Sequence, residues 1–166
     1  PARIENIGAE FMDKSKFTRR GFLTGAGVVV LGGAAVFGAN QFNIGAQAGE
    51  DGTLSTPQAH NAALSGAIVL VDIRRPDEWT RTGVGEGAVP ISMLDRDFID
   101  QVSAKVSGDH TQPVALICAR GVRSRKMTTR LQQAGFTNII DVPEGMLGSG
   151  AGAGWIKRGL PTVVMN

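Results

Sequence analysis

The chain has 166 residues and carries 17 Lys and Arg against 15 Asp and Glu, which gives a formal net charge of +2. This length suits one domain with a core of its own, and charges so nearly balanced exclude a broad basic face for nucleic acid. Cys118 is the only cysteine in the sequence, so an intrachain disulfide is excluded and the cellular location must be inferred from the N-terminus.

Residues 1–48 have the order of an export leader. The pair Arg19-Arg20 is followed by an uncharged segment, residues 21–49, that is rich in Gly, Ala and Val. Ala46-Gln47-Ala48 then provides the small-x-small pattern of a cleavage site. Paired arginines before Phe-Leu resemble the twin-arginine export signal, although Thr24 stands where that signal usually has lysine.

The leader therefore predicts a protein that uses the export machinery, with residues 49–166 as the mature domain. Its location would be periplasmic if the source is bacterial. The alternative is an uncleaved leader that anchors the protein in a membrane, because about twenty apolar residues are enough to span the hydrocarbon core.

Short apolar runs alternate with helix-like segments throughout the domain. Continuous apolar runs are typical of strands buried on both faces of a parallel sheet. Strands are expected at residues 67–72, 88–91, 114–117 and 137–142, and helices at residues 57–64 (with Thr56 as N-cap), 93–105 and 122–133. This alternation predicts an α/β domain of three layers on a mainly parallel sheet.

The most informative stretch surrounds Cys118. The apolar run Val114–Ile117 leads into the cysteine, which would lie at the carboxyl end of a strand, where open α/β sheets bind ligands. The following helix would offer unpaired backbone N–H groups and a positive dipole end, and Arg120 and Arg123 would add formal charge. These effects favour an anion, either a thiolate, a persulfide or an oxyanion such as thiosulfate. The alternative is an inert cysteine in the core.

A charged block follows the first expected strand, from Asp72 to Trp79. Arg123 would bury part of its guanidinium beside the cysteine loop, and a buried cation needs a carboxylate partner. Both Glu78 and Asp72 are candidates for this partner, with Glu78 slightly favoured.

At these residues the chain resembles a known family. The stretch Cys118-Ala-Arg-Gly-Val-Arg-Ser124 resembles the active-site loop Cys-x-x-Gly-x-Arg-Ser of the rhodanese sulfurtransferases. Residues 72–79 resemble the family's Asp-x-Arg-x-x-x-Glu block, and residues 143–161 resemble its Gly-rich block that ends in Trp and Gly-Leu-Pro. Val84 departs from the family, which usually has histidine there, so local packing is expected to differ.

The resemblance implies a five-stranded sheet with helices on both faces, with one short edge strand near Thr53. It implies that Cys118 takes sulfane sulfur from thiosulfate or a persulfide donor and passes it to a thiol, sulfite, cyanide or an acceptor protein. Neither a metal nor an organic cofactor is implied, and no nucleic acid. The substrate-binding residues would be Ala119, Arg120, Gly121, Val122 and Arg123, supported by Asp72, Arg74, Glu78 and Ser124.

Two other functions stay open. One is a non-catalytic sulfur carrier, which would hold a persulfide for a partner protein. The other is a phosphatase or arsenate-type enzyme on a related loop. Four residues separate Cys118 from Arg123, whereas phosphatase loops of this kind have five, so the shorter loop favours sulfur over a tetrahedral phosphate.

Overall fold

The computed structural model describes residues 52–165. The expected leader and its boundary at residue 49 lie outside the described residues, so both stay predictions. Within residues 52–165, no helix has the length and apolar character needed to cross a membrane.

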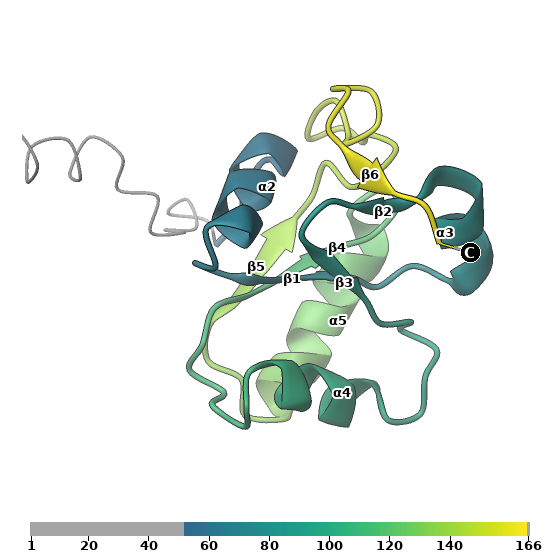
Figure 1. The fold of residues 1–166 in the computed structure, drawn as a ribbon. Helices are drawn as coiled ribbons and strands as arrows, with labels where there is room; N and C mark the ends of the chain where they lie inside the picture. Colours follow the sequence, from purple (N-terminus) through teal and green to yellow (C-terminus); the bar gives the residue numbers. More distant parts are fainter. Residues whose placement is uncertain (1–51, 166) are drawn as a thin grey trace, which may run out of the picture. The chain divides into compact units, whose positions relative to one another are not determined.

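A parallel sheet forms the centre of the domain (Figure 1). Its strands run in the order β3-β1-β4-β5, and each neighbouring pair is parallel. The apolar runs extend slightly beyond the strands at three of the four expected positions. The strands are β1 (Val69–Asp72), β3 (Ala88–Pro90), β4 (Val114–Ile117) and β5 (Ile139–Val142).

The expectation of five strands was wrong for the described residues, which place four in this sheet. At the expected edge position, Thr53 forms only an isolated parallel bridge with Asp141. Leu54 N–H donates to the Asp141 carbonyl at 2.9 Å, and Asp141 N–H donates to the Gly52 carbonyl at 3.1 Å. Because Ser55 already caps a helix, the extended segment ends before a strand can form.

Four helices are present in the described part of the chain. Pro stands in the first turn of both α2 and α3, where its missing N–H costs nothing. Ser55, rather than Thr56, is the N-cap of α2, and the Gln58 side chain accepts a hydrogen bond from the Ser55 N–H at 2.9 Å. The helices are α2 (Thr56–Leu64), α3 (Pro76–Thr82), α4 (Phe98–Lys105) and α5 (Val122–Gln133).

Two helices differ from the expectation. α4 begins later than residue 93, because the Asp95 N–H bonds to the Ser92 carbonyl at 3.0 Å in a preceding turn. α3 was not expected at all, since its charged sequence lacks an apolar periodicity. Two further short strands, β2 (Val84–Gly85) and β6 (Thr162–Val163), pair antiparallel outside the main sheet.

The two faces of the sheet pack against different helices, which gives the three layers expected from the sequence (Figure 1). On β4, successive side chains alternate between the two cores, as they must in a strand. The core on the side of α4 and α5 includes Val114, Leu116, Cys118, Phe98 and Leu131. The core on the side of α2 includes Ala115, Ile117, Ala59, Ala62 and Trp155.

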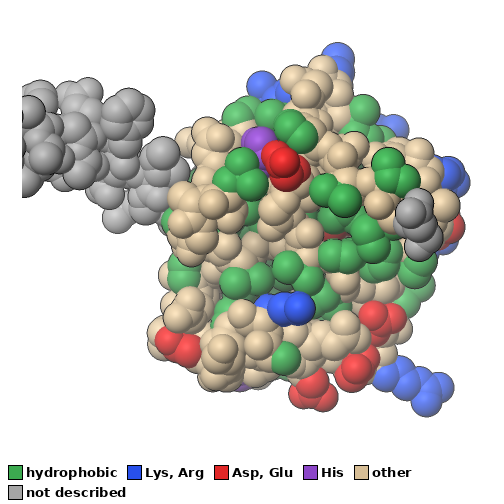
Figure 2. Space-filling view, in the orientation of Figure 1, with side chains coloured by type: hydrophobic (Ala, Val, Ile, Leu, Met, Phe, Trp, Pro, Cys, Tyr) green, Lys and Arg blue, Asp and Glu red, His purple; other side chains and the backbone are tan. Residues whose placement is uncertain are grey.

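Some hydrophobic side chains stay on the surface. Figure 2 shows several groups of them on the face turned to the viewer, with acidic and basic side chains between them. The most exposed are Val164, Leu94 and Val122. Val122 belongs to the segment around the cysteine.

The order of the strands creates a switch point between β1 and β4. The chain leaves β1 toward β3 on one side of it, and β4 and β5 lie on the other side. In open α/β sheets, ligands bind at the carboxyl ends of the strands at such a point. Asp72 pairs with Ile117 in this register, so the segments that follow β1 and β4 are neighbours there.

Candidate active site

Cys118 directly follows β4 and lies at the base of the switch point. Cys118 is 1% exposed and belongs to the core on the α5 side. The neighbouring segment after β1 is fixed to it by a hydrogen bond from the Ile73 N–H to the Ile117 carbonyl, at 3.0 Å. The two loops therefore form one continuous platform around the sulfur.

The loop turns back over the sulfur at Gly121. The Gly121 N–H donates to the Cys118 Sγ at 3.1 Å, and the residue has a φ of +78°, a left-handed conformation that favours glycine. A Cβ there would also collide with the Pro143 carbonyl oxygen. The chain needs glycine at this position for both reasons.

Ser124 closes the other side of the sulfur. The Cys118 thiol donates to the Ser124 Oγ at 3.6 Å, and the Ser124 hydroxyl donates to the Gly121 carbonyl at 3.0 Å. Ser124 is fully buried. The serine of the expected motif therefore contacts both the Cys118 sulfur and the turn that covers it.

The carbonyl groups of the loop are held by a second segment. The Met146 N–H donates to the Cys118 carbonyl at 2.8 Å, and the Leu147 N–H donates to the Ala119 carbonyl at 2.9 Å. A Cβ on Gly145 would lie 2.6 Å from the Ala119 carbonyl oxygen, so glycine permits this close approach. These hydrogen bonds fix the carbonyl groups of Cys118 and Ala119 to the segment that follows Glu144.

Several of those N–H groups have no acceptor in the described part of the chain. Gly121 uses its N–H on the sulfur, whereas Ala119, Arg120, Val122 and Arg123 donate no backbone hydrogen bond within residues 52–165. Val122 and Arg123 begin α5, and Ala119 and Arg120 precede its N-cap, so all four lie near the helix end where the dipole adds partial positive charge. This arrangement is chemically suited to an anion attached to, or lying beside, the sulfur.

Arg123 pairs with Glu78, the carboxylate favoured from the sequence. Its two terminal nitrogens donate to the two carboxylate oxygens, each at 2.6 Å. The hydrogen bonds from Arg123 lower the pKa of Glu78 from 4.5 to about 2, against the opposing effect of burial. The same pair raises the pKa of Arg123, and the nearby Cys118 adds to that rise. The guanidinium is therefore a fixed positive charge near the sulfur.

The ion pair between Arg123 and Glu78 is expected to make the stability of the domain sensitive to acid. Because the folded-state pKa is lowered, its stabilisation is present above about pH 4.5 and is lost as the pH falls toward 2. Glu78→Gln is expected to lower the free energy of unfolding by about 1–3 kcal/mol at neutral pH, a range reduced for solvent screening because Arg123 is 29% exposed. Urea unfolding of both proteins measures this, and the gap should narrow steadily toward pH 3. A gap independent of pH would show that the ion pair is not its source.

Asp72 has a different partner from the one that the sequence left open. Its carboxylate accepts hydrogen bonds from the Arg74 side chain, the shortest at 2.7 Å, and both side chains are at most 1% exposed. Arg74 also donates to the Thr82 hydroxyl and to the Gly83 carbonyl, each at 2.7 Å. The pair therefore fixes the start and end of α3, and with it the position of Glu78.

The remaining loop residues lie at the surface. Val122 is 66% exposed, Arg120 is exposed and Ala119 is half-buried. Arg120 lines a cavity of about 290 Å³, together with Leu147, Ser149 and Lys157 and the glycine-rich segment between them. Cys118 itself does not line this cavity. No cluster of three or more His, Cys, Asp or Glu side chains suited to a metal ion occurs in residues 52–165.

Glu144 supports the site but was missed by the sequence reasoning. Its carboxylate accepts hydrogen bonds from the Thr56 N–H at 2.9 Å and the Thr56 hydroxyl at 2.7 Å, and it also pairs with Arg158. It is 5% exposed. Glu144 thus joins α2 and the C-terminal segment to the turn that holds the loop carbonyls. The sequence signal that could have revealed it was a charged residue placed between Pro143 and Gly145.

Comparison with known proteins agrees with this arrangement. The family model described as Rhodanese-like domain matches residues 55–149, which contain the cysteine loop and both sides of its platform. The chain belongs to this family. It is 33% identical over 119 residues to "Thiosulfate sulfurtransferase 16, chloroplastic" of Arabidopsis thaliana, an alignment that covers 66% of this chain and 91% of that protein.

Other relatives of the chain differ from it in length and have names that indicate another function. The chain is 35% identical over 98 residues to a tRNA uridine(34) hydroxylase of Sinorhizobium medicae, covering 58% of this chain and 31% of that protein. The chain thus spans about a third of that relative.

Solved structures show the same fold. The polysulfide-sulfur transferase homodimer of Wolinella succinogenes has a TM-score of 0.53 at 25% identity, with 80% of this chain and 90% of that chain covered. A protein of Rhodopseudomonas palustris described as a possible tyrosine phosphatase has a TM-score of 0.52 at 25% identity, with 84% and 100% covered.

Proposed function

We propose that this domain is a sulfurtransferase that carries sulfane sulfur as a persulfide on Cys118. The Cys118 thiolate attacks the outer sulfur of thiosulfate, the sulfur–sulfur bond of the donor breaks, and sulfite leaves with the electron pair. A thiol, sulfite or cyanide acceptor then attacks the outer sulfur of the persulfide. The Cys118 thiolate is the leaving group of this second step, so the enzyme returns to its starting state without a metal or an organic cofactor.

The observation that carries this proposal is the cradle around the sulfur. The Gly121 N–H lies 3.1 Å from the Cys118 Sγ, and four neighbouring N–H groups have no acceptor among residues 52–165. Donors fixed in this way stabilise negative charge that develops on the attacking and accepted sulfurs. Arg123, held by Glu78, adds a full charge beside them.

The charge at the mouth of the site supports an anionic donor. Arg120 and Lys157 both line the cavity of about 290 Å³ beside the loop, and no carboxylate lines it. A small dianion such as thiosulfate, or a polysulfide anion, suits these charges. The Wolinella succinogenes relative is named for polysulfide, and the Arabidopsis thaliana relative for thiosulfate.

A turnover assay separates the enzyme from a sulfur carrier. With thiosulfate and cyanide in excess, the enzyme is expected to form thiocyanate steadily, many times per molecule. A carrier would load once and stop until a partner protein removed the sulfur. Thiocyanate that never exceeds the amount of protein would therefore favour the carrier, which then requires a sulfur-acceptor protein as its partner.

The Rhodopseudomonas palustris relative gives the phosphatase alternative a specific basis, and the length of the loop opposes it. Four residues separate Cys118 from Arg123, one fewer than in phosphatase loops of this kind. The smaller cradle suits a single outer sulfur better than a tetrahedral phosphate. Hydrolysis of an aryl phosphate is expected to be negligible. Hydrolysis that depends on Cys118, in a protein that forms no persulfide, would make the phosphatase the better assignment.

The proposal extends to the place of action. We propose that the leader directs export through the twin-arginine route and is removed after Ala48. N-terminal sequencing of the exported protein is expected to begin at Gly49, and replacing Arg19 and Arg20 with lysine is expected to stop export. A mature protein that still contains Phe37 would show a retained anchor, and normal export of the lysine variant would exclude the twin-arginine route.

A further inference from the structure

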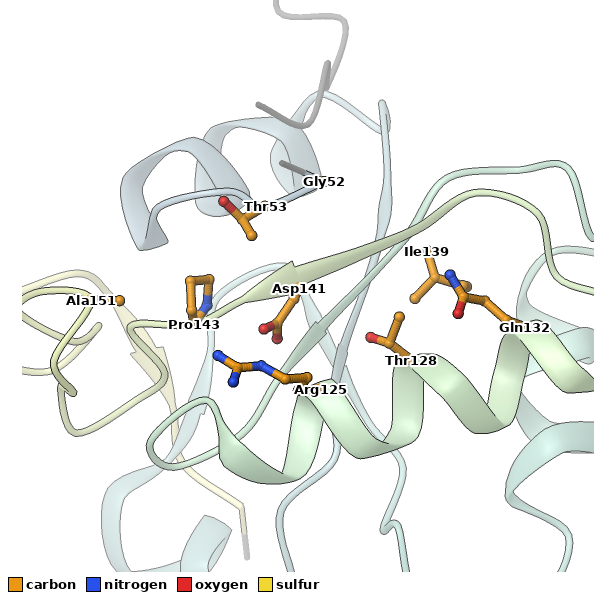
Figure 3. A pocket seen from close by; sticks show the side chains of 9 residues that line it. All are labelled: Gly52, Thr53, Arg125, Thr128, Gln132, Ile139, Asp141, Pro143 and Ala151. Atoms are coloured by element: carbon orange, nitrogen blue, oxygen red, sulfur yellow. The ribbon is translucent and has the colours of Figure 1, made fainter. Parts of the chain in front are cut away.

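A second pocket lies between α5 and β5. Its volume is about 490 Å³, and neither Cys118 nor residues 119–124 line it. Figure 3 shows polar side chains from both elements converging on it: Arg125, Thr128 and Gln132 come from α5, and Asp141 comes from β5. Ile139 and Pro143 supply apolar walls. None of these side chains has a role in the proposed sulfur transfer.

Asp141 is the unusual member of this group. It stands in a buried strand, where Ile140 and Val142 pack into the core on the α2 side, so its own side chain faces α5. It is 8% exposed, and its Oδ1 atom is buried without a hydrogen-bond partner in the described part of the chain. A buried carboxylate oxygen without a donor is costly, so the negative charge of Asp141 is poorly compensated inside the protein. Because Asp141 also lines the pocket, a positive group bound there would be stabilised by that charge.

Arg125 offers the complementary charge. Its side chain is exposed, and it makes no ion pair within residues 52–165. Figure 3 shows its guanidinium beneath Asp141, on the side of Pro143. The two charges attract each other, but no direct salt bridge joins them among the ion pairs of residues 52–165. Both side chains line the same pocket, so one bound molecule can contact both.

This set of charges selects the class of ligand. A lone carboxylate does not make a site for a divalent metal, which prefers several oxygen ligands. A phosphate or sulfate would be repelled by Asp141. A simple amine would satisfy Asp141 but leave Arg125 without a partner. A molecule with a positive and a negative group close together satisfies both.

We propose that this pocket binds a small zwitterion of the α-amino acid type, with its ammonium group at Asp141 and its carboxylate at Arg125. Thr128 and Gln132 lie along the same side of α5 and can hydrogen-bond the rest of the molecule. The apolar walls accommodate a small side chain. The volume of about 490 Å³ accepts an amino acid with room to spare.

Binding is expected to depend on pH in a defined direction. Burial raises the pKa of Asp141, and the nearby Ser124 hydroxyl and the charge of Arg125 oppose that rise. The ammonium group needs the ionised carboxylate, so affinity should be present at neutral pH and lost as the pH falls through this raised pKa. Arg125 stays charged throughout, and no histidine lines the pocket to titrate in the same range.

Amide chemical shifts of the full chain, recorded during a titration with glycine, test the proposal. Glycine carries both charges and no side chain, and acetate and methylammonium each carry one of them. Saturable shifts are expected at Arg125, Gln132 and Asp141 with glycine. Acetate and methylammonium are each expected to bind at least about tenfold more weakly, because each loses one charge-assisted contact.

Variants locate the binding. Asp141→Asn and Arg125→Gln are each expected to weaken glycine binding at least about tenfold. Arg130→Gln is the matched control, since it removes a cation from α5 that does not line the pocket, and it should leave the affinity unchanged. The spectra themselves report whether each variant is folded.

Three results would overturn the zwitterion site. One is the absence of saturable shifts with glycine, and another is glycine binding of wild-type strength in folded Asp141→Asn. The third is acetate binding as strong as that of glycine, which would indicate a plain anion contact at Arg125. Sulfur transfer is not measured in any of these arms, so a failure of the proposed function and a failure of this site are distinguishable.

Discussion

Cys118→Ser is expected to abolish sulfur transfer, lowering the rate of thiocyanate formation about a thousandfold or more, to the rate without protein. Serine has no sulfur that can accept the donor's outer sulfur, and its hydroxyl is far less acidic than a thiol. The measurement is steady-state turnover with thiosulfate and cyanide. The effect should be so large because every step of the proposed reaction passes through this one atom.

The same variant should keep its fold. Serine is close to cysteine in size. Its oxygen would replace a sulfur that accepts a hydrogen bond from the Gly121 N–H and contacts the Ser124 hydroxyl. A melting curve near that of the wild type is the necessary control. Turnover retained by a folded Cys118→Ser protein would contradict the proposed role of Cys118.

Arg74→Met is expected to give the largest loss of stability among the site's charged residues. It leaves the Asp72 carboxylate, which is 0% exposed, without the three hydrogen bonds that the Arg74 side chain donates to it. The hydrogen bond from the Arg74 backbone N–H survives the substitution. Breaking a buried ion pair by removing one partner typically costs about 3–5 kcal/mol, and urea unfolding would measure it.

Two further variants isolate the cause. Asp72→Asn combined with Arg74→Met removes the stranded charge and should recover part of the loss. Arg81→Gln breaks an exposed pair with Asp77, whose side chains are 66% and 54% exposed, and should cost less than about 1 kcal/mol. If Arg74→Met were as mild as Arg81→Gln, the Asp72–Arg74 pair would not be the anchor of α3.

The features set by local sequence were predictable. β4 and α5 have their expected bounds, because Val114–Ile117 is uniformly apolar and a glycine precedes the helix. Glu78 was favoured as the partner of Arg123, and the structure pairs them. These results depend on contacts that a short motif specifies almost completely.

Other features depend on contacts distant in the sequence. The charge block could not show that Asp72 pairs with Arg74, because that choice depends on where β1 ends and α3 begins. β2 and β6 are two residues each, too short for any periodicity, and they pair across most of the domain. Thr53 was expected to lie in a strand, but the cap of α2 ends the extended segment there.

The environment of Asp141 also could not be predicted from the sequence. A carboxylate inside the apolar run Ile139–Val142 was visible in the sequence. The sequence did not show that its Oδ1 atom is buried without a hydrogen-bond partner, because this depends on how β5 packs against α5. The pocket that it lines is formed by residues that are distant in the sequence, so it could not be predicted from a local pattern.

Intact mass spectrometry tests the central claim most directly. After incubation with thiosulfate and removal of the small molecules, the wild-type protein is expected to gain the mass of one sulfur atom, and cyanide should remove it. Cys118→Ser should gain nothing under the same conditions. A wild-type protein that gains no sulfur, or a sulfur adduct that also forms on Cys118→Ser, would contradict a persulfide carried by Cys118.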